Sequence, residues 1–276
     1  MSGAAVQSLA VDELVGRVSG RRMRARLARG ALWLGFAALV WWAGRAVVIQ
    51  DTDWRRISWE TVGKSLRGFL AIDIGLAPSL LGPAVETALM ATLATLLGVL
   101  LAVPVAWLGA RDISPLGPGS YLVGRALMTV SRSVHEIVWG LLFVAAAGLG
   151  ALAGILAMGV RSVGFIAKTV AEAIEDVDRR PVEAMRAVGA NRLQVLMFAI
   201  VPQVLPVFLG NVVFEWDVNI RRSTIMGLVG AGGLGLALHR QMAASSFGGV
   251  AAVVLVILCL IVLGEIASYY VRKAVI

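Results

Sequence analysis

Two short stretches place ionisable side chains inside strongly apolar sequence, where charge is costly and usually faces a partner or a water-filled cavity. In the first stretch, Arg132 and Glu136 are four residues apart, so one helix would bring them to the same face, where they could pair. The second stretch has the consecutive side chains Arg221, Arg222, Ser223 and Thr224. Its guanidinium forks and hydroxyls, with free backbone N–H groups beside a glycine-rich bend, would suit a phosphate-like oxyanion. These six side chains are therefore candidates for a substrate path.

Each of the two stretches also allows a purely structural interpretation. The pair formed by Arg132 and Glu136 could only fix the packing of helices. The two arginines of the second stretch could contact lipid headgroups, or they could pair with Glu215 and Asp217 a few residues earlier. The residues alone leave these alternatives open.

Motifs for enzymatic chemistry are missing from the sequence. It contains no G-x-x-x-x-G-K-[ST] motif, so we do not expect the chain to hydrolyse ATP. Neither H-E-x-x-H nor G-x-S-x-G occurs, and the single cysteine, Cys259, lies in an apolar run. Residues 230–235 formally match G-x-G-x-x-G, but no strand-helix-strand unit surrounds them, so we interpret them as flexible backbone within the membrane. The glycines assigned to this hinge or gate are Gly230, Gly232, Gly233 and Gly235. We expect no catalytic residue, metal site or cofactor in this chain.

The composition is that of a protein embedded in a membrane. Apolar residues make up 59% of the chain and charged residues 15%, and the mean hydropathy is +0.85. Soluble domains are about 45–50% apolar and about 25% charged. The net charge of +8 comes from lysines and arginines that flank apolar runs, which is typical of topology signals rather than of a nucleic-acid-binding surface. We therefore predict no nucleic-acid partner.

The hydropathy pattern predicts an all-α polytopic membrane protein with six transmembrane helices. The predicted spans are 31–49, 84–109, 126–148, 149–177, 193–214 and 249–270. Residues 1–30 form a basic tail, which either lies on anionic lipid or is simply solvated, and residues 50–83 form an extracytoplasmic connection. The membrane core, 84–272, includes a glycine-rich re-entrant segment at 221–242. An even number of spans puts both termini on one side, which the positions of Lys and Arg assign to the cytoplasm.

The stretch from Glu183 to Pro202 predicts a short polar helix, a break and a second helix that becomes apolar. Glu183 is an acid in a first helical turn, Ala184 is small, and Gly189 permits a turn. Such a hairpin could dock into a groove of another protein. Its spacing resembles the signature loop of ABC-importer permeases, which reads Glu-Ala-Ala, three residues, Gly, nine residues, Ile, one residue, Leu-Pro. Glu183, Ala184, Gly189 and Pro202 match this signature, whereas Met185, Ala199 and Val201 depart from it.

Two further stretches, 132–139 and 214–235, resemble the phosphonate-transport branch of this superfamily, and the likeness covers about residues 80–272. His135 departs from that branch, which usually has Pro or a similar residue there. The resemblance implies the type I importer architecture, in which residues 176–196 form a cytoplasmic coupling helix and loop that an ATPase subunit grips. It also implies a homodimeric permease in a bacterial inner membrane, with an extracytoplasmic phosphonate-binding protein. Two ATPase subunits would bind the ATP and Mg that this chain does not.

The sequence thus predicts the permease subunit of an ATP-driven importer for phosphonate or a related phosphorus oxyanion, working by alternating access. One alternative keeps the superfamily and changes the cargo to phosphate, phosphite or an amino acid. A second alternative is an ion-coupled secondary transporter, whose expected marks are inverted repeats and midplane carboxylates. Neither mark is clear in this sequence.

Overall fold

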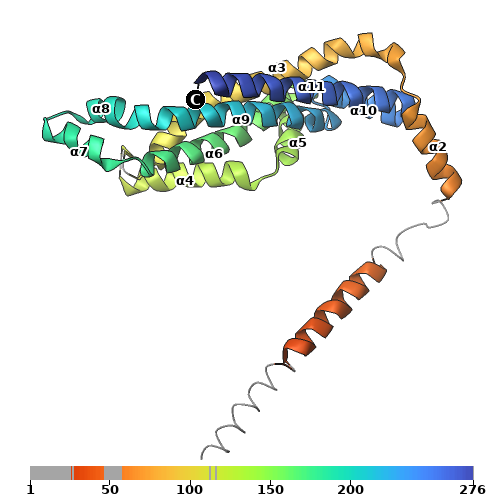
Figure 1. The fold of residues 1–276 in the computed structure, drawn as a ribbon, viewed down its shortest axis with the longest axis horizontal. Helices are drawn as coiled ribbons and strands as arrows, with labels where there is room; N and C mark the ends of the chain where they lie inside the picture. Colours follow the sequence, from red (N-terminus) through yellow and green to blue (C-terminus); the bar gives the residue numbers. More distant parts are fainter. Residues whose placement is uncertain (1–25, 27, 47–57, 112, 116, 276) are drawn as a thin grey trace, which may run out of the picture. The chain divides into compact units, whose positions relative to one another are not determined.

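The computed structural model describes residues 26, 28–46, 58–111, 113–115 and 117–275 (Figure 1). The chain divides into two compact units, Met1–Lys64 and Ser65–Ile276. Throughout the described residues, regular secondary structure is helical and no strand occurs. The predicted all-α class is therefore confirmed.

In the first unit, residues 28–44 form an α-helix whose apolar side chains are largely exposed, among them Trp33, Trp41 and Trp42. This helix covers most of the predicted first span, but residues 47–49 lie outside the described part of the chain, as does nearly all of the predicted basic tail. The predicted connection 50–83 is described only from residue 58. It contains an amphipathic helix, α2 (Trp59–Leu70), which crosses the boundary between the two units.

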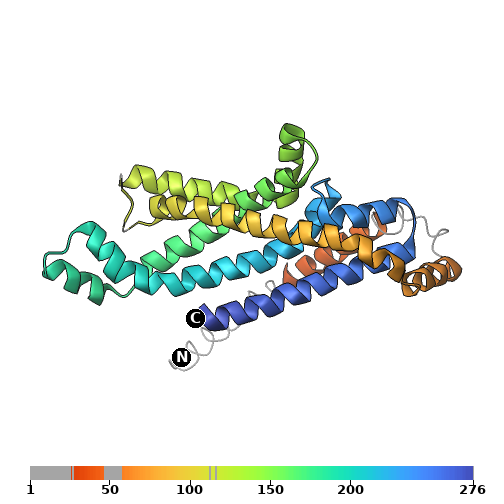
Figure 2. The ribbon, with the colours of Figure 1, turned by 90° about the horizontal axis from the view of Figure 1, so that it is seen from above.

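The second unit is a bundle of helices. Their bounds are η3 (Ile74–Leu76), α3 (Ala77–Gly109), α4 (Pro118–Ser133), α5 (Glu136–Ala147), α6 (Ala151–Glu175), α7 (Arg179–Ala187), α8 (Arg192–Val195), the π-helix η4 (Leu196–Ile200), α9 (Val201–Leu228), α10 (Gly233–Ala243) and α11 (Phe247–Val275). Helix α3 packs along α6 and α9, and α11 packs along α9 (Figure 2). Helices α7 and α8 project from one end of this bundle, and α10 lies at the other end (Figure 1).

Four helical segments in the described residues are long and apolar enough to cross a membrane. They are Ile74–Gly109, Ala151–Glu175, Arg192–Ala243 and Phe247–Ala274, and a bent pair, α4 with α5, makes a fifth if it is counted as one span. The predicted third span, 126–148, is wrong as a single helix, because the chain bends by 93° between Ser133 and Glu136. The predicted fifth span ends too early, because α9 continues to Leu228.

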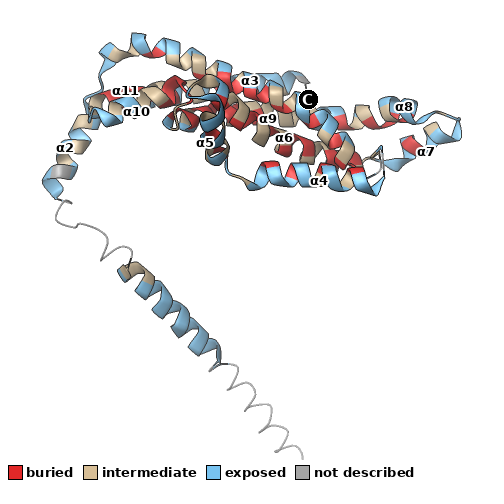
Figure 3. Ribbon diagram, turned by 180° about the vertical axis from the view of Figure 1, so that it is seen from behind, coloured by how far each residue is buried: buried red, intermediate tan, exposed pale blue. Residues whose placement is uncertain are grey.

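The centre of the bundle is packed through small residues. Ala94, Ala157 and Gly98 are buried, and a Cβ added at Gly98 would lie 2.5 Å from the Cβ of Ser162. Small side chains allow membrane helices to approach closely where no hydrophobic effect drives their association. The outward faces of the same helices carry exposed leucines such as Leu100 and Leu263, and Figure 3 shows buried residues gathered on the inward faces. This distribution fits a bundle surrounded by lipid.

Helix α10 begins beside the last turn of α9. A Cβ added at Gly235 would lie 1.9 Å from the carbonyl oxygen of Thr224 and 2.7 Å from the Cα of Gly227. Only glycine fits so close an approach of two backbones. The predicted segment 221–242 is a helix, a break and a second helix. The sequence predicted a short span followed by a re-entrant segment, whereas α8 to α10 together form one apolar stretch of 52 residues.

Candidate functional site

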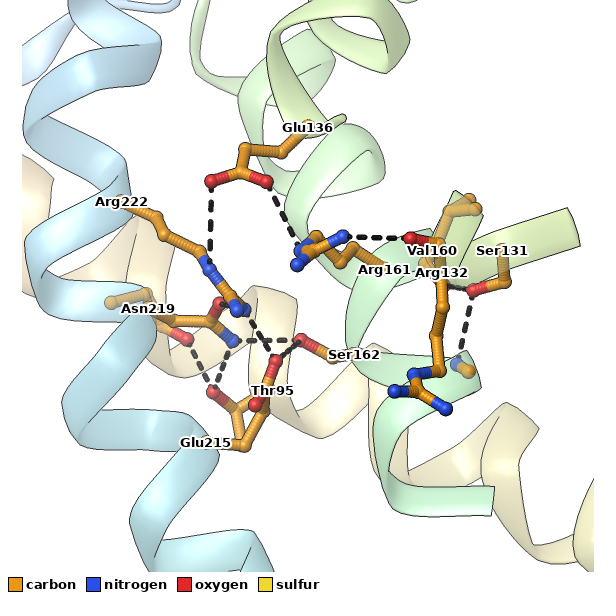
Figure 4. Close-up of polar contacts among 12 residues, drawn as sticks. Thr95, Ser131, Arg132, Glu136, Val160, Arg161, Ser162, Glu215, Asn219 and Arg222 are labelled. Atoms are coloured by element: carbon orange, nitrogen blue, oxygen red, sulfur yellow. Dashed lines mark hydrogen bonds and ion pairs between the residues drawn. The ribbon is translucent and has the colours of Figure 1, made fainter. Parts of the chain in front are cut away.

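A buried polar network joins three helices at the centre of the bundle (Figure 4). Glu215 of α9 accepts a hydrogen bond from the hydroxyl of Ser162 of α6, over 3.0 Å. Asn219 of α9 donates to the hydroxyls of Ser162, over 2.9 Å, and of Thr95 of α3, over 3.0 Å. All four residues are buried. Buried polar groups are expensive unless they are paired, so these contacts favour one arrangement of the three helices.

Two arginines extend this network to a fourth helix. The Nη1 of Arg222 donates to Oε1 of Glu215, over 2.5 Å, and to Oδ1 of Asn219, over 3.2 Å. The Nε of Arg222 lies 3.7 Å from Oε1 of Glu136, the first residue of α5. The other carboxylate oxygen of Glu136 lies 3.0 Å from the Nε of Arg161 on α6. We call Arg161, Arg222, Glu136 and Glu215 the ion-pair network.

The ion-pair network is neutral, since it contains two guanidinium groups and two carboxylates. The Glu215 side chain is 1% exposed and that of Glu136 is 9% exposed, whereas Arg161 is 28% exposed. Charges at this depth are tolerated in pairs, and removal of one partner leaves an uncompensated charge that is strongly destabilising. Arg161 has the most exposed side chain of the four, although its Nε is buried.

The predicted pairing of Arg132 with Glu136 is wrong. Helix α4 ends at Ser133, and His135 is the N-cap of α5, so no continuous helix places the two residues on one face. Arg132 contributes its carbonyl oxygen, which accepts from Nη1 of Arg161 over 3.1 Å, and its guanidinium points away from Glu136 (Figure 4). Sequence reasoning missed Arg161, although a lone arginine inside an apolar helix was a signal for it.

The second predicted stretch is helical, so its backbone N–H groups are not free for an oxyanion. Arg221 pairs with Asp217 one turn earlier, and Arg222 pairs with Glu215. The hydroxyl of Ser223 donates to the carbonyl oxygen of Ile220, and the hydroxyl of Thr224 is buried without a hydrogen-bond partner. The alternative in which the arginines pair with the preceding acids is confirmed, and the predicted backbone donors are wrong. Only Arg222 of the four reaches the ion-pair network.

The glycines assigned to a hinge lie where α9 meets α10. Gly230, Gly232 and Gly233 have positive φ angles, and Gly235 makes the close helix contact described above. The backbone N–H of Gly233 donates to Oε2 of Glu86, over 3.1 Å, and that of Leu234 donates to the hydroxyl of Thr87, over 2.9 Å. Side chains of α3 thus hold the N-terminus of α10, whose free N–H groups favour such acceptors. The hinge role of these glycines stays a prediction.

Three of the four predicted coupling residues, Glu183, Ala184 and Gly189, lie in a hairpin formed by α7, α8 and the turn between them, and the fourth, Pro202, lies in α9. Asp178 is the N-cap of α7, and its carboxylate accepts from the backbone N–H of Arg180. The Arg180 guanidinium beside it also lowers the pKa of Asp178 below its usual range. Val182 is buried in the core, whereas Glu183 and Ala184 are exposed, with Ala184 on the other side of the helix and Glu183 between the two faces. One face of α7 is therefore anchored to the bundle and the opposite face is free for contacts with another protein. The prediction that Glu183 lies in the first turn of its helix is wrong, because α7 begins at Arg179.

Gly189 ends α7 in the way the sequence predicted. It has a φ of 83°, a conformation that glycine adopts without a Cβ penalty. The backbone N–H of Gly189 donates to Arg186 and that of Ala190 donates to Met185, which is the hydrogen-bond pattern of a Schellman turn. These two hydrogen bonds fix the backbone of the turn. The turn leads directly into the capping box of α8, which is formed by Asn191 and Gln194.

The far end of the hairpin is tied to α9. Pro202 lies in the first turn of α9, directly after the π-helix η4. The side chain of the next residue, Gln203, accepts from the backbone N–H of Asp178, over 3.0 Å, and donates to the carbonyl oxygens of Asp178 and Ala199. Gln203 therefore links the N-cap of α7 to α9, the helix that carries Glu215 and Arg222.

A cavity of about 760 Å³ lies between the hairpin and the neighbouring ends of α3 and α6. Its lining includes Trp107 at the end of α3, Glu183 of α7 and three basic side chains, Arg179, Arg186 and Arg192. In the described part of the chain, no group of three or more His, Cys, Asp or Glu could hold a metal ion.

A helical membrane bundle with an exposed hairpin beside its core is the architecture of a membrane permease subunit, which is not itself catalytic. Residues 94–276 match the family described as the inner membrane component of binding-protein-dependent transport systems. The chain belongs to this family of ABC-transporter permeases, whose members work with ATPase and substrate-binding-protein partners.

Several curated relatives are named as permeases for phosphorus oxyanions, and others, at 26–28% identity, as probable D-methionine transport permeases. The chain is 44% identical over 191 residues to the phosphite transport system permease protein PtxC of Stutzerimonas stutzeri, a match that covers 69% of each chain. It is 40% identical over 190 residues to the phosphate-import permease protein PhnE of Mycolicibacterium smegmatis, covering 69% of this chain and 36% of the relative. It is 32% identical over 118 residues to the putative cryptic phosphonate transport system permease protein PhnE2 of Escherichia coli, covering 43% of this chain and 97% of the relative.

The fold is that of solved type I importer permeases. A chain of the MetNI methionine ABC transporter in an inward-facing conformation superposes with a TM-score of 0.63 at 23% identity. The superposition covers 74% of this chain and all of the other chain. The predicted type I architecture is thereby confirmed.

Proposed function

We propose that this chain is the permease subunit of an ATP-driven importer for phosphonate or a related phosphorus oxyanion such as phosphite or phosphate. The observation that carries the cargo class is the likeness to permeases for phosphite, phosphate and phosphonate, at 32–44% identity. Membership of the binding-protein-dependent family leaves the ion-coupled secondary transporter without support. An amino acid is the less favoured cargo, because the sequence likeness to probable D-methionine transport permeases is lower, at 26–28% identity.

The proposed complex contains two copies of this chain, two ATPase subunits that bind ATP and Mg, and an extracytoplasmic binding protein that delivers the oxyanion. It lies in the cytoplasmic membrane of a bacterium, with lipid against the exposed apolar faces and with both termini on the cytoplasmic side. The hairpin then faces the cytoplasm, where an ATPase subunit can reach it. The basic residues near the hairpin support this orientation by the positive-inside rule.

The proposed mechanism is alternating access driven through the hairpin. Closure of the ATPase dimer moves α7, whose exposed face carries Glu183 and Ala184, and the turn at Gly189 keeps the hairpin stiff. Because Gln203 ties the start of the hairpin to α9, the movement reaches Glu215 and Arg222 in the core. The change in helix packing opens the path outward, and hydrolysis of ATP resets it.

Uptake of labelled methylphosphonate into cells that lack this chain tests the proposal. We expect uptake to be restored by the intact chain and not by Glu183→Lys, because reversal of an exposed charge on α7 would disturb the ATPase contact. Glu60→Lys is the matched control, since Glu60 is an exposed glutamate on α2, far along the chain from the hairpin, and this variant should restore uptake. Uptake that never depends on the chain would overturn the cargo, and equal uptake by the two variants would overturn the coupling role.

A further inference from the structure

We propose that Arg161 and Arg222 form the binding seat for the phosphorus oxyanion, and that the carboxylate of Glu136 occupies this seat in the conformation seen here. The inference rests on the proposed function, because it assigns the cargo of that function to a place in the path. It makes Glu136 a built-in substitute for the substrate rather than a residue that only fixes helix packing.

The geometry of the contact is the first support. The two oxygens of one carboxylate, on α5, each face a different guanidinium, one from α6 at 3.0 Å and one from α9 at 3.7 Å (Figure 4). Guanidinium groups present donors in a planar fork that matches carboxylates and phosphates alike. Oε2 of Glu136 and Nε of Arg161 are both buried without a hydrogen bond, so the carboxylate meets the two guanidinium groups as ion pairs. A phosphorus oxyanion, with its oxygens on one tetrahedral centre, can therefore take the position of the Glu136 carboxylate between the same two cations.

The anchoring of the two arginines is the second support, because each is held by a group other than Glu136. Arg222 is held through Nη1 by Glu215 and Asn219. Arg161 is held through Nη1 by the carbonyl oxygen of Arg132. If Glu136 left, both guanidinium groups would keep these contacts and the seat would remain formed, which is the preorganisation that a binding site needs.

Glu136 is placed so that it can leave. It is the first residue of α5, directly after the 93° bend that separates α5 from α4. Its ion-pair partners are these two arginines and the neighbouring His135, whose Nε2 lies 3.9 Å away. A shift of α5 would therefore withdraw the carboxylate without unwinding α4 or breaking the contacts between α6 and α9.

The charge balance explains why a substitute is needed. The ion-pair network is neutral with Glu136 in place and carries one excess positive charge without it. An unpaired charge at this depth is costly, so Glu136 protects the arginines until an anion replaces it.

Binding of labelled methylphosphonate to the purified permease–ATPase complex, without the binding protein, tests the inference by equilibrium dialysis. We expect Glu136→Gln to bind at least tenfold more tightly than the intact chain, because the amide no longer neutralises the two arginines. Adding Arg222→Ala to Glu136→Gln should abolish the gain. The matched control is Glu175→Gln. Glu175, at the end of α6, forms an ion pair with Arg125, so this variant also removes a carboxylate that pairs with an arginine, and it should leave binding unchanged.

The inference is overturned if an assembled Glu136→Gln complex, monodisperse in gel filtration, binds methylphosphonate no more tightly than the intact complex. An equal gain in Glu175→Gln would also overturn it, because the effect would then be general charge rather than the seat. If Glu136→Gln does not assemble, Glu136→Asp provides the test, with a several-fold gain expected and no gain contradicting the inference. The proposed function fails separately, if the intact chain supports no uptake of any phosphorus oxyanion.

Discussion

The ion-pair network and the hairpin hold their charged groups in opposite ways. In the network, partners come from α5, α6 and α9, and Glu136, Glu215 and Arg222 have side chains that are at most 15% exposed. In the hairpin, contacts such as that of Asp178 with Arg180 lie within a few residues, and both side chains are exposed. The network can therefore distinguish one helix arrangement from another, whereas the hairpin keeps its own shape through local contacts. A transporter driven by a partner needs both properties.

The largest expected effect is loss of a buried partner, by Glu215→Leu. Because this change leaves Arg222 buried without its shortest contact, we expect the solubilised complex to lose about 3–5 kcal/mol of stability. Thermal unfolding measures the loss. Glu172→Leu is the control, since Glu172 pairs with Lys168 on a partly exposed surface of the same bundle, and its loss should stay below about 1 kcal/mol. Equal losses of stability in the two variants would contradict the difference between buried and exposed ion pairs.

Gly235→Ala should have the next largest effect, on the contact between α9 and α10. Its new Cβ would lie 1.9 Å from a backbone oxygen, so the helices must separate, at a cost of about 1–3 kcal/mol. Gly82→Ala is the matched control, because nothing lies within 4 Å of its new Cβ. The same unfolding measurement compares the two variants. An unaffected Gly235→Ala variant would contradict the close contact.

Gly189→Val should damage coupling more than stability. The left-handed backbone at Gly189 costs a residue with a Cβ about 1–2 kcal/mol, so the turn would open and the exposed face of α7 would be lost. We expect the permease to remain folded and assembled as a dimer while uptake is abolished. Gly189→Asn, which tolerates this conformation, should keep most of the uptake. Full uptake by the valine variant would show that the rigidity of the hairpin is unnecessary.

The smallest effect is expected from Asp178→Asn, which keeps the helix cap and removes the charge that pairs with Arg180. Because the folded pKa of Asp178 is lowered, its contribution is present at neutral pH and is lost only as the pH falls below about 4. We expect uptake at neutral pH within about twofold of the intact chain. Asp178→Ala, which also removes the cap, should slow uptake further. A severe loss in the Asn variant would assign the charge a role in coupling.

The same contrast explains what the sequence could predict. The hairpin was predictable, because a cap, a glycine in a left-handed turn and a capping box are local features, and Gly189 has the expected conformation. The all-helical class and most of the apolar spans followed from hydropathy. The network was not predictable in detail, because the partners of Glu136 lie 25 and 86 residues along the chain and depend on a bend after Ser133 that no proline or glycine marks. Arg132 was therefore paired wrongly and Arg161 was missed.

Reconstituted uptake tests the central claim most directly. The purified complex would be placed in liposomes with the binding protein outside and ATP inside, and accumulation of labelled methylphosphonate, phosphite and phosphate would be followed. The account predicts accumulation of at least one of these oxyanions that requires both ATP and the binding protein and is lost in the Glu183→Lys variant. Accumulation driven by an ion gradient without ATP, or no accumulation of any phosphorus oxyanion by an active complex, would contradict it.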